Sequence, residues 1–138
     1  MIIDKAFIEP FARTTERAAY GASLFKSKDD KVAADQSAVD EMRMQLNKIN
    51  MKGKIVIGEG ELDEAPMLYI GEEVGNKSGD EFDIAVDPLE GTYFTAKNLP
   101  NALSVLAVTR KGNLLHAPDT YMEKIVIGPG LPENLIDL

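Results

Sequence analysis

The sequence contains no cysteine and a single histidine, His116, among its 138 residues. Without cysteine there is no disulfide, no thiolate metal site and no cysteine nucleophile. One histidine is too few for a His-rich zinc site. Any bound metal must therefore take oxygen ligands, which favours Mg²⁺ or Mn²⁺. The lack of cysteine also fits a reducing compartment, and we expect the protein to be cytoplasmic.

Long apolar runs and an excess of basic charge are also missing. No apolar run approaches the length of a membrane span, and the three apolar residues at the N-terminus give way at once to Asp4 and Lys5. Lysine and arginine total 15 against 23 aspartate and glutamate, so the net charge is −8. Non-specific nucleic-acid binding needs basic surface to neutralise phosphates. We therefore expect neither a membrane nor a nucleic-acid partner, and the acids form either a solvated surface or a cation site.

The apolar share of 44% is that of a globular protein, and the length fits one domain or part of one. Three-four spacing predicts a helix over residues 6–24, with Pro10 in its first turn, and a second helix following Asp35. Apolar runs predict strands at 54–58, 83–87, 102–108 and 124–127, and a turn at 111–113 leading into a paired strand at 114–117. Residues 65–75 are ambiguous. These elements predict a layered α/β (α+β) fold, with a mixed sheet and flanking helices.

Two acids and a Gly-Thr pair follow the apolar run at 84–86. Asp87 precedes Pro88, and Glu90 lies three residues after Asp87. Proline cannot donate to a sheet ladder and restricts the residue before it, so the strand is expected to stop at Asp87. Open α/β sheets bind their ligands at the carboxyl ends of strands. The stretch therefore predicts a carboxylate site.

A second acidic stretch begins at Glu59, again directly after an apolar strand pattern. Such a run is usually a solvated loop, but Gly58 and Gly60 flank Glu59, which suits close backbone approach to a ligand. Asp35 precedes the second helical pattern. Its simplest interpretation is an N-cap or first-turn acid, which the free amides of a helix start favour.

Strand ends in one sheet meet at one edge, so Asp35, Glu59, Asp87 and Glu90 are candidates for one site. Converging carboxylates repel unless they are protonated or neutralised, and two or more Mg²⁺ or Mn²⁺ ions would neutralise them. Such a cluster suits hydrolysis of a phosphate ester. The Thr92 hydroxyl would orient the attacking water, and the first amides of the helix after it would hold the phosphate.

Competing chemistries have less support. An aspartyl-phosphate mechanism of the haloacid-dehalogenase type needs a second aspartate two residues after the first, whereas position 89 is Leu89. A Ser-His-Asp triad is disfavoured, since no nucleophile-elbow motif surrounds any serine. His116 is interpreted as a packed or edge-strand residue, and Tyr121, on spacing alone, as a core or edge aromatic.

Long motifs at residues 57–72 and 83–92 closely resemble class II fructose-1,6-bisphosphatases. Residues 34–35 and 117–124 and the Gly-Pro-Gly near the C-terminus agree with the same family. The family belongs to the lithium-sensitive, metal-dependent sugar phosphatases with a layered α/β fold, and some members also hydrolyse sedoheptulose-1,7-bisphosphate. The sequence departs from the family pattern at Tyr93 and at Leu99-Pro100, next to the site.

The resemblance implies Asp35 and Glu59 as ligands of one metal, and Asp87 and Glu90 as ligands of another. It implies a catalytic role for Glu59, Asp87 and Thr92. The substrate-binding positions that it implies are Glu90, Gly91, Thr92 and Tyr121. The implied reaction is metal-dependent hydrolysis of the 1-phosphate of fructose-1,6-bisphosphate to fructose-6-phosphate, a step of gluconeogenesis and carbohydrate metabolism, by an enzyme that is a homo-oligomer when full length.

The resemblance also implies that residues 1–138 form the N-terminal, metal-binding part of such a domain, incomplete at the C-terminus. The alternative is that this chain is a truncated, non-catalytic fragment or a metal-binding interaction module. On that alternative it is inactive without the missing C-terminal half.

Overall fold

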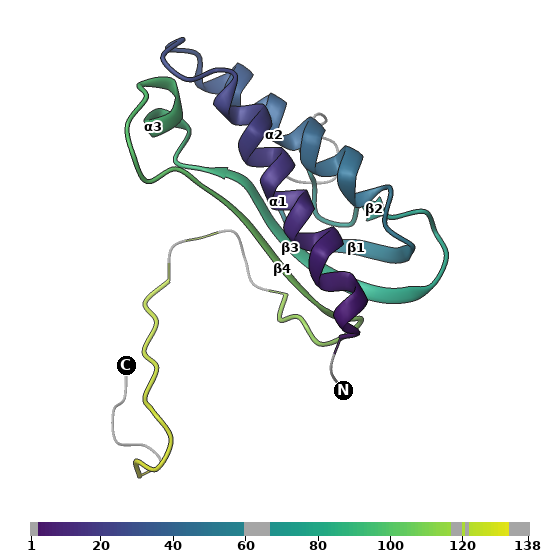
Figure 1. Cartoon of the computed structure of the whole chain (residues 1–138). Helices are drawn as coiled ribbons and strands as arrows, with labels where there is room; N and C mark the ends of the chain where they lie inside the picture. The colour runs from purple at the N-terminus through teal and green to yellow at the C-terminus, as the bar shows by residue number, and fades with distance from the viewer. Residues whose placement is uncertain (1–2, 60–66, 117–119, 121, 133–138) are drawn as a thin grey trace.

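The computed structural model describes residues 3–59, 67–116, 120 and 122–132. Two long helices come first, followed by three strands, a short helix and a fourth strand, and the four strands form one mixed sheet in the order β2-β1-β3-β4. β1 runs parallel to β3, whereas β2 and β4 are antiparallel to their neighbours. The predicted α/β fold is confirmed (Figure 1). The elements are a 3-10 turn at Lys5–Phe7, α1 Ile8–Ser23, α2 Lys31–Leu46, β1 Met51–Ile57, β2 Glu73–Val74, β3 Asp80–Glu90, α3 Thr92–Ala96 and β4 Leu103–Arg110.

The core lies between the sheet and the two long helices, which run side by side over one face (Figure 1). Phe82 of β3 points into this layer, with its ring centroid 4.9 Å from that of Phe7 and 5.9 Å from that of Phe11. Ile55 and Ile84, paired across β1 and β3, are fully buried on the same side. Because strand side chains alternate, the residues between them face away from the helices.

Of the two long helices, α1 begins two residues later than the sequence predicted, and α2 begins earlier than predicted. α1 starts at Ile8, and Pro10 lies in its first turn as expected, where its missing N–H breaks no helical bond. α2 starts at Lys31, because the Asp30 side chain accepts the Ala33 N–H at 2.9 Å and caps the helix. Asp35 therefore lies in the second turn of α2. Its interpretation as an N-cap or first-turn acid is wrong.

The strand at the candidate site is longer than predicted. β3 continues through Pro88 to Glu90, so the expected stop at Asp87 is wrong. The pairing with β4 shifts between Asp87 and Glu90, and β1 has no partner for β3 beyond Ala85. Pro88 thus occupies a bulge with no β1 neighbour, where its missing N–H breaks no ladder bond.

Two predicted strands near the end of the chain are absent from the described residues. The turn after β4 forms, with Asn113 N–H donating to Arg110 O at 3.2 Å, but residues 114–116 and 124–127 form no strand. Residues 122–132 are exposed throughout and run beyond the sheet (Figure 1). The apolar side chains of Ile125, Val126 and Ile127 stay exposed, and β-propensity alone does not order this stretch into a strand.

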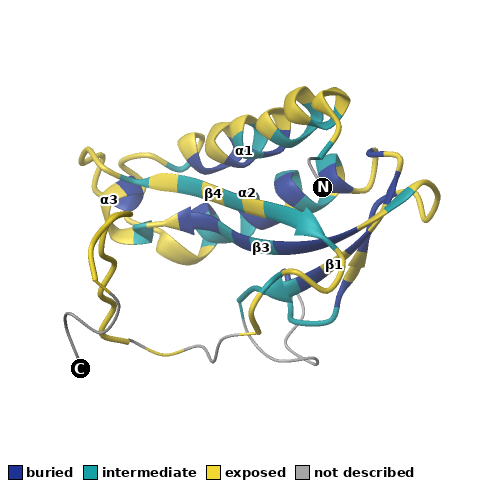
Figure 2. Cartoon of the chain, turned by 90° about the horizontal axis from the view of Figure 1, so that it is seen from below, coloured by how far each residue is buried: buried dark blue, intermediate teal, exposed yellow. Residues whose placement is uncertain are grey.

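The face of the sheet turned away from the helices keeps apolar side chains in solvent. On β4, Leu103 is 59% exposed and Val105 is 45% exposed. Figure 2 shows this contrast between the buried centre of β3 and the partly exposed β4. No helix in the described part of the chain is long and apolar enough to cross a membrane.

Candidate metal and phosphate site

Parallel pairing of β1 and β3 brings the carboxyl ends of both strands to one edge of the sheet. Glu59 comes two residues after the end of β1. Asp87 and Glu90 lie in the last four residues of β3. Glu59 therefore lies at the same edge as Asp87 and Glu90, as the strand pattern predicted.

Asp87 is the most perturbed acid of this edge. Burial raises the pKa of Asp87 to about 7, together with a side-chain hydrogen bond to Glu90 and repulsion by the charges of Glu90 and Asp35. The carboxyls of Asp87, Glu90 and Asp35 are thus close enough to influence one another's ionisation. The structure brings these three predicted residues together.

Asp35 reaches this edge from α2, above the strand ends. Burial raises the pKa of the Asp35 carboxyl, because the charged form loses hydration. Its Oδ1 atom is buried and has no hydrogen-bond partner among the described residues, and the same holds for Oδ1 of Asp87. Buried carboxylate oxygens without a donor are costly unless another group satisfies them.

Glu59 is held through its backbone. Its N–H donates to Leu68 O at 3.0 Å. A Cβ on Gly58 would lie 2.3 Å from that same oxygen, so glycine is required for the chain to pass here. The predicted close approach at Gly58 exists, but it is to the Leu68 backbone. Gly60, the other glycine of the prediction, lies outside the described residues.

Thr92 begins α3 directly after Gly91, which takes a left-handed conformation with φ of 86°. The amides of Phe94 and Thr95 both donate to Gly91 O, at 3.0 and 3.3 Å, and so close the first turn on Gly91 itself. Thr92 is half-buried and follows Glu90 by two residues. Tyr121, the remaining predicted substrate contact, lies outside the described residues.

Sequence reasoning missed the residues that hold α3 in place. Lys97 at its end pairs with Asp29 at 2.7 Å, and Asp29 N–H donates to Ala96 O at 3.2 Å. The Lys31 ammonium lies 5.0 Å from the ring centroid of Tyr93. Tyr93, which departs from the family pattern, is therefore in contact with the start of α2. Only the charged stretch at 26–31 signalled these contacts.

The donor set fits a hard divalent cation. Buried oxygens of Asp35 and Asp87, with Glu90 beside them, are the ligands that Mg²⁺ and Mn²⁺ prefer. In the described ranges, however, no three acidic or imidazole groups are already grouped tightly enough to enclose an ion. A cation would have to displace the proton that the raised pKa of Asp87 favours, so binding would be coupled to proton release.

The fold and these acids define a layered α/β protein with an oxygen-donor site at the carboxyl edge of its sheet. The chain belongs to the family described as bacterial fructose-1,6-bisphosphatase, glpX-encoded, whose model matches residues 5–138.

Among curated relatives, fructose-1,6-bisphosphatase 1 class 2 of Escherichia coli K12 is 57% identical over 128 residues, which cover 93% of this chain and 38% of that protein. The class 2 enzyme of Haemophilus influenzae is 51% identical, over 99% of this chain and 40% of its own length. A protein of Synechococcus strain CC9902, named D-fructose 1,6-bisphosphatase class 2/sedoheptulose 1,7-bisphosphatase, is 49% identical, over 92% and 38%. The chain thus spans about two fifths of the length of these relatives.

Proposed function

We propose that this chain forms the metal-binding part of an enzyme that hydrolyses the 1-phosphate of fructose-1,6-bisphosphate. One observation carries the proposal: Asp35, Asp87 and Glu90 converge at the carboxyl edge of the sheet, and Oδ1 of Asp35 and of Asp87 is buried with no donor among the described residues. The names of the relatives point to the substrate. Asp35 and Glu59 would hold one divalent ion, and Asp87 and Glu90 another.

The chain's own groups would do the remaining work. A bound divalent cation supplies polarisation of the phosphoryl oxygens and a lower pKa for water. The Thr92 hydroxyl would orient the attacking water, since it stands two residues past Glu90 at the start of α3. Glu90, Gly91, Thr92 and Tyr121 would contact the substrate. Attack of the water oxygen on phosphorus breaks the bond to the sugar oxygen, which takes a proton from solvent, and leaves fructose-6-phosphate and phosphate.

The test is phosphate release from fructose-1,6-bisphosphate by the full-length product of the gene, with and without Mn²⁺. Asp87→Asn and Glu59→Gln should each lower Mn²⁺-dependent turnover by more than about 100-fold, which exceeds the loss typical of residues behind the ligands. Glu9→Gln, at an exposed acid of α1, should leave turnover unchanged. Unaltered activity in Asp87→Asn or Glu59→Gln would sink the assignment.

Several finer points remain part of the proposal. Sedoheptulose-1,7-bisphosphate is a second candidate substrate, because one relative carries both activities in its name. Turnover of the two sugar bisphosphates, each measured with Mg²⁺ and with Mn²⁺, would identify both the preferred substrate and the preferred cation. A homo-oligomer and a cytoplasmic location are likewise proposed, and light scattering of the purified protein and cell fractionation would check them.

The second candidate is that the 138-residue chain alone is a non-catalytic fragment or a metal-binding interaction module. The exposed apolar side chains of β4, Leu103 and Val105, favour it. Calorimetry of the isolated chain separates the two cases. A cooperative melt together with bisphosphatase turnover would refute the fragment hypothesis.

A further inference from the structure

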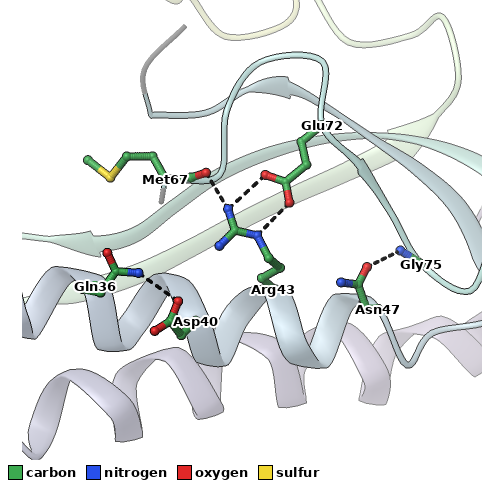
Figure 3. A network of polar contacts seen from close by, with 7 residues as sticks. All are labelled: Gln36, Asp40, Arg43, Asn47, Met67, Glu72 and Gly75. Atoms are coloured by element: carbon green, nitrogen blue, oxygen red, sulfur yellow. Dashed lines mark hydrogen bonds and ion pairs between the residues drawn. The ribbon is translucent and has the colours of Figure 1, made fainter. Parts of the chain in front are cut away.

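A partly buried ion pair joins α2 to the segment that follows the acidic stretch. Arg43 Nε donates to Glu72 Oε1 at 2.7 Å, and Nη2 donates to Glu72 Oε2 at 3.1 Å (Figure 3). The same Nη2 also donates to the carbonyl oxygen of Met67. Glu72 is only 9% exposed. One guanidinium therefore fixes both ends of residues 67–72, which we call the support loop.

The support loop in turn holds Glu59. Its second residue, Leu68, is fully buried and accepts the Glu59 N–H at 3.0 Å. Its end is fixed to β1, since Gly71 N–H donates to Ile55 O at 2.8 Å and Ile55 N–H donates to Glu72 O at 2.9 Å. The position of Glu59 therefore depends on where the support loop lies.

Arg43 and Asp35 are on the same helix, eight residues apart, which is about 12 Å along the helix axis. A helix of this length moves as one rigid element. Any displacement of α2 relative to the support loop would therefore change the position of Asp35 relative to Glu59. The bidentate pair prevents that displacement, because its two parallel hydrogen bonds specify orientation as well as distance.

We propose that Arg43 and Glu72 are positioning residues that fix Glu59 relative to α2, and so set the geometry of the Asp35–Glu59 pair. The role of that pair as cation ligands rests on the proposed function, but the chain of contacts from Arg43 to Glu59 does not. Arginine is suited to this task and lysine is not, since an ammonium cannot hold both carboxylate oxygens and a carbonyl in one plane.

Single substitutions would leave a buried charge without its partner, so the test uses a double substitution. Arg43→Met with Glu72→Met removes both charges and keeps similar volume, a change that is often neutral for stability. A matched control is available on the same helix. Arg17 and Glu41 join α1 to α2, with 2.9 Å between Nε and Oε2, and neither contacts the support loop. Arg17→Met with Glu41→Met removes an ion pair of the same type elsewhere.

The first measurement is hydrogen exchange at the Glu59 amide in the full-length product without added metal, read at single-residue resolution by mass spectrometry. The Arg43→Met/Glu72→Met variant should exchange about tenfold faster at Glu59, while the control pair leaves that amide unchanged. Unaltered exchange at Glu59, or an equal change in both variants, overturns the proposal.

The second measurement is a calorimetric titration with Mn²⁺ alone. Removing Arg43 and Glu72 should weaken Mn²⁺ binding about 10–100-fold, the range typical of residues that orient metal ligands, and the control pair should not. Arg43→Lys keeps the positive charge, and it should bind Mn²⁺ more tightly than the double variant but less tightly than the wild-type protein. Full recovery by lysine would show that charge rather than orientation matters, and would overturn the positioning role.

The two proposals fail separately. If wild-type protein binds Mn²⁺ and hydrolyses the bisphosphate while the double variant matches it in exchange and affinity, the positioning role is wrong and the proposed function stands. If wild-type protein shows no turnover, the proposed function is wrong, and exchange at the Glu59 amide still decides the positioning role.

Discussion

The two acidic strand ends look alike in sequence, yet the molecule supports them in different ways. At the end of β1, Glu59 is held by Leu68, and that contact depends on Arg43 and Glu72, which are 29 residues apart. At the end of β3, Asp87 and Glu90 are held by the strand itself, by a bulge at Pro88 and by α3 directly behind.

This difference means that the two ends respond to different changes. The β3 end is held mainly by backbone, through its pairing with β4 and the turn at Gly91 into α3. The β1 end is set by side chains from another element, so a substitution far from any ligand reaches Glu59. Substitutions that perturb one end and spare the other therefore test whether the two supports are independent.

The largest effect is expected from Arg43→Met alone. The variant leaves the Glu72 carboxylate, 9% exposed, without its cation, which costs about 3–5 kcal/mol of unfolding free energy. Arg17→Met, which breaks the more exposed pair with Glu41, should cost about 1 kcal/mol or less. Urea denaturation of both variants of the full-length product gives the comparison. Equal losses of unfolding free energy in the two variants would show that the Arg43–Glu72 pair stabilises the fold no more than the Arg17–Glu41 pair does.

A smaller effect is expected at Gly58. Its added Cβ in Gly58→Ala would lie 2.3 Å from the Leu68 carbonyl oxygen, so backbone has to move. We expect a loss of about 1–3 kcal/mol in unfolding free energy. A displaced Glu59 should also lower Mn²⁺-dependent turnover, by about 100-fold if the shift reaches 1 Å. Gly128→Ala is the matched control, because nothing lies within 4 Å of the added Cβ there.

At the β3 end, the corresponding change is Gly91→Ala. With φ of 86°, the left-handed conformation costs an alanine about 1–2 kcal/mol. Its Cβ would lie 2.8 Å from the movable ring of Phe94 and at an ordinary contact distance of 3.6 Å from Ala102 Cα. Gly91→Asn should lose less, since asparagine tolerates this conformation. Urea denaturation measures the loss, and exchange at the Glu59 amide should stay at the wild-type rate. A faster Glu59 amide would show that the two ends are coupled.

Much of the fold followed from local patterns. The apolar runs predicted β1, β3 and β4, the three-four spacing predicted α1, and Gly91 with Thr92 marked the start of α3. That Glu59 and Asp87 come to one edge also followed, because it needs only that neighbouring strands run parallel. The ionic contacts that make α3 and the support loop rigid have no such local signature.

The wrong predictions share one physical cause, which is dependence on a distant neighbour. Pro88 is accepted in β3 because β1 has already ended and because β3 carries the extra residue of a bulge in its pairing with β4. Neither fact can be read from the sequence of β3. Strands at 114–117 and 124–127 need an apolar surface to pack on, which their own residues do not reveal. The start of α2 is the exception, since Asp30 before a run of helix-forming residues was a local signal that sequence reasoning missed.

The smallest expected effect concerns protonation at the β3 end. The pKa of Asp87 is raised from 3.8 to about 7 by burial and by Glu90 and Asp35, so the folded state keeps a proton that the unfolded chain releases. This contribution to stability is fully present below pH 3.8 and is lost as the pH rises to about 7. Because the group is partly exposed, the loss should be at most about 1 kcal/mol.

Denaturation of the metal-free, full-length product at several pH values between 3.8 and about 7 checks whether the unfolding free energy falls as the pH rises. Asp87→Asn should remove this fall in unfolding free energy with rising pH. Glu9→Gln, at an exposed acid of α1, should keep it. Added Mn²⁺ should reverse the trend in wild type, because the ion binds the deprotonated carboxylate and stabilises the folded state more as the pH rises. A stability that rises with pH in the metal-free protein, and does so equally in Asp87→Asn, would show that Asp87 carries no proton at the β3 end. The contrast between a backbone-held end that keeps a proton and an end supported by side chains of another element would then fail.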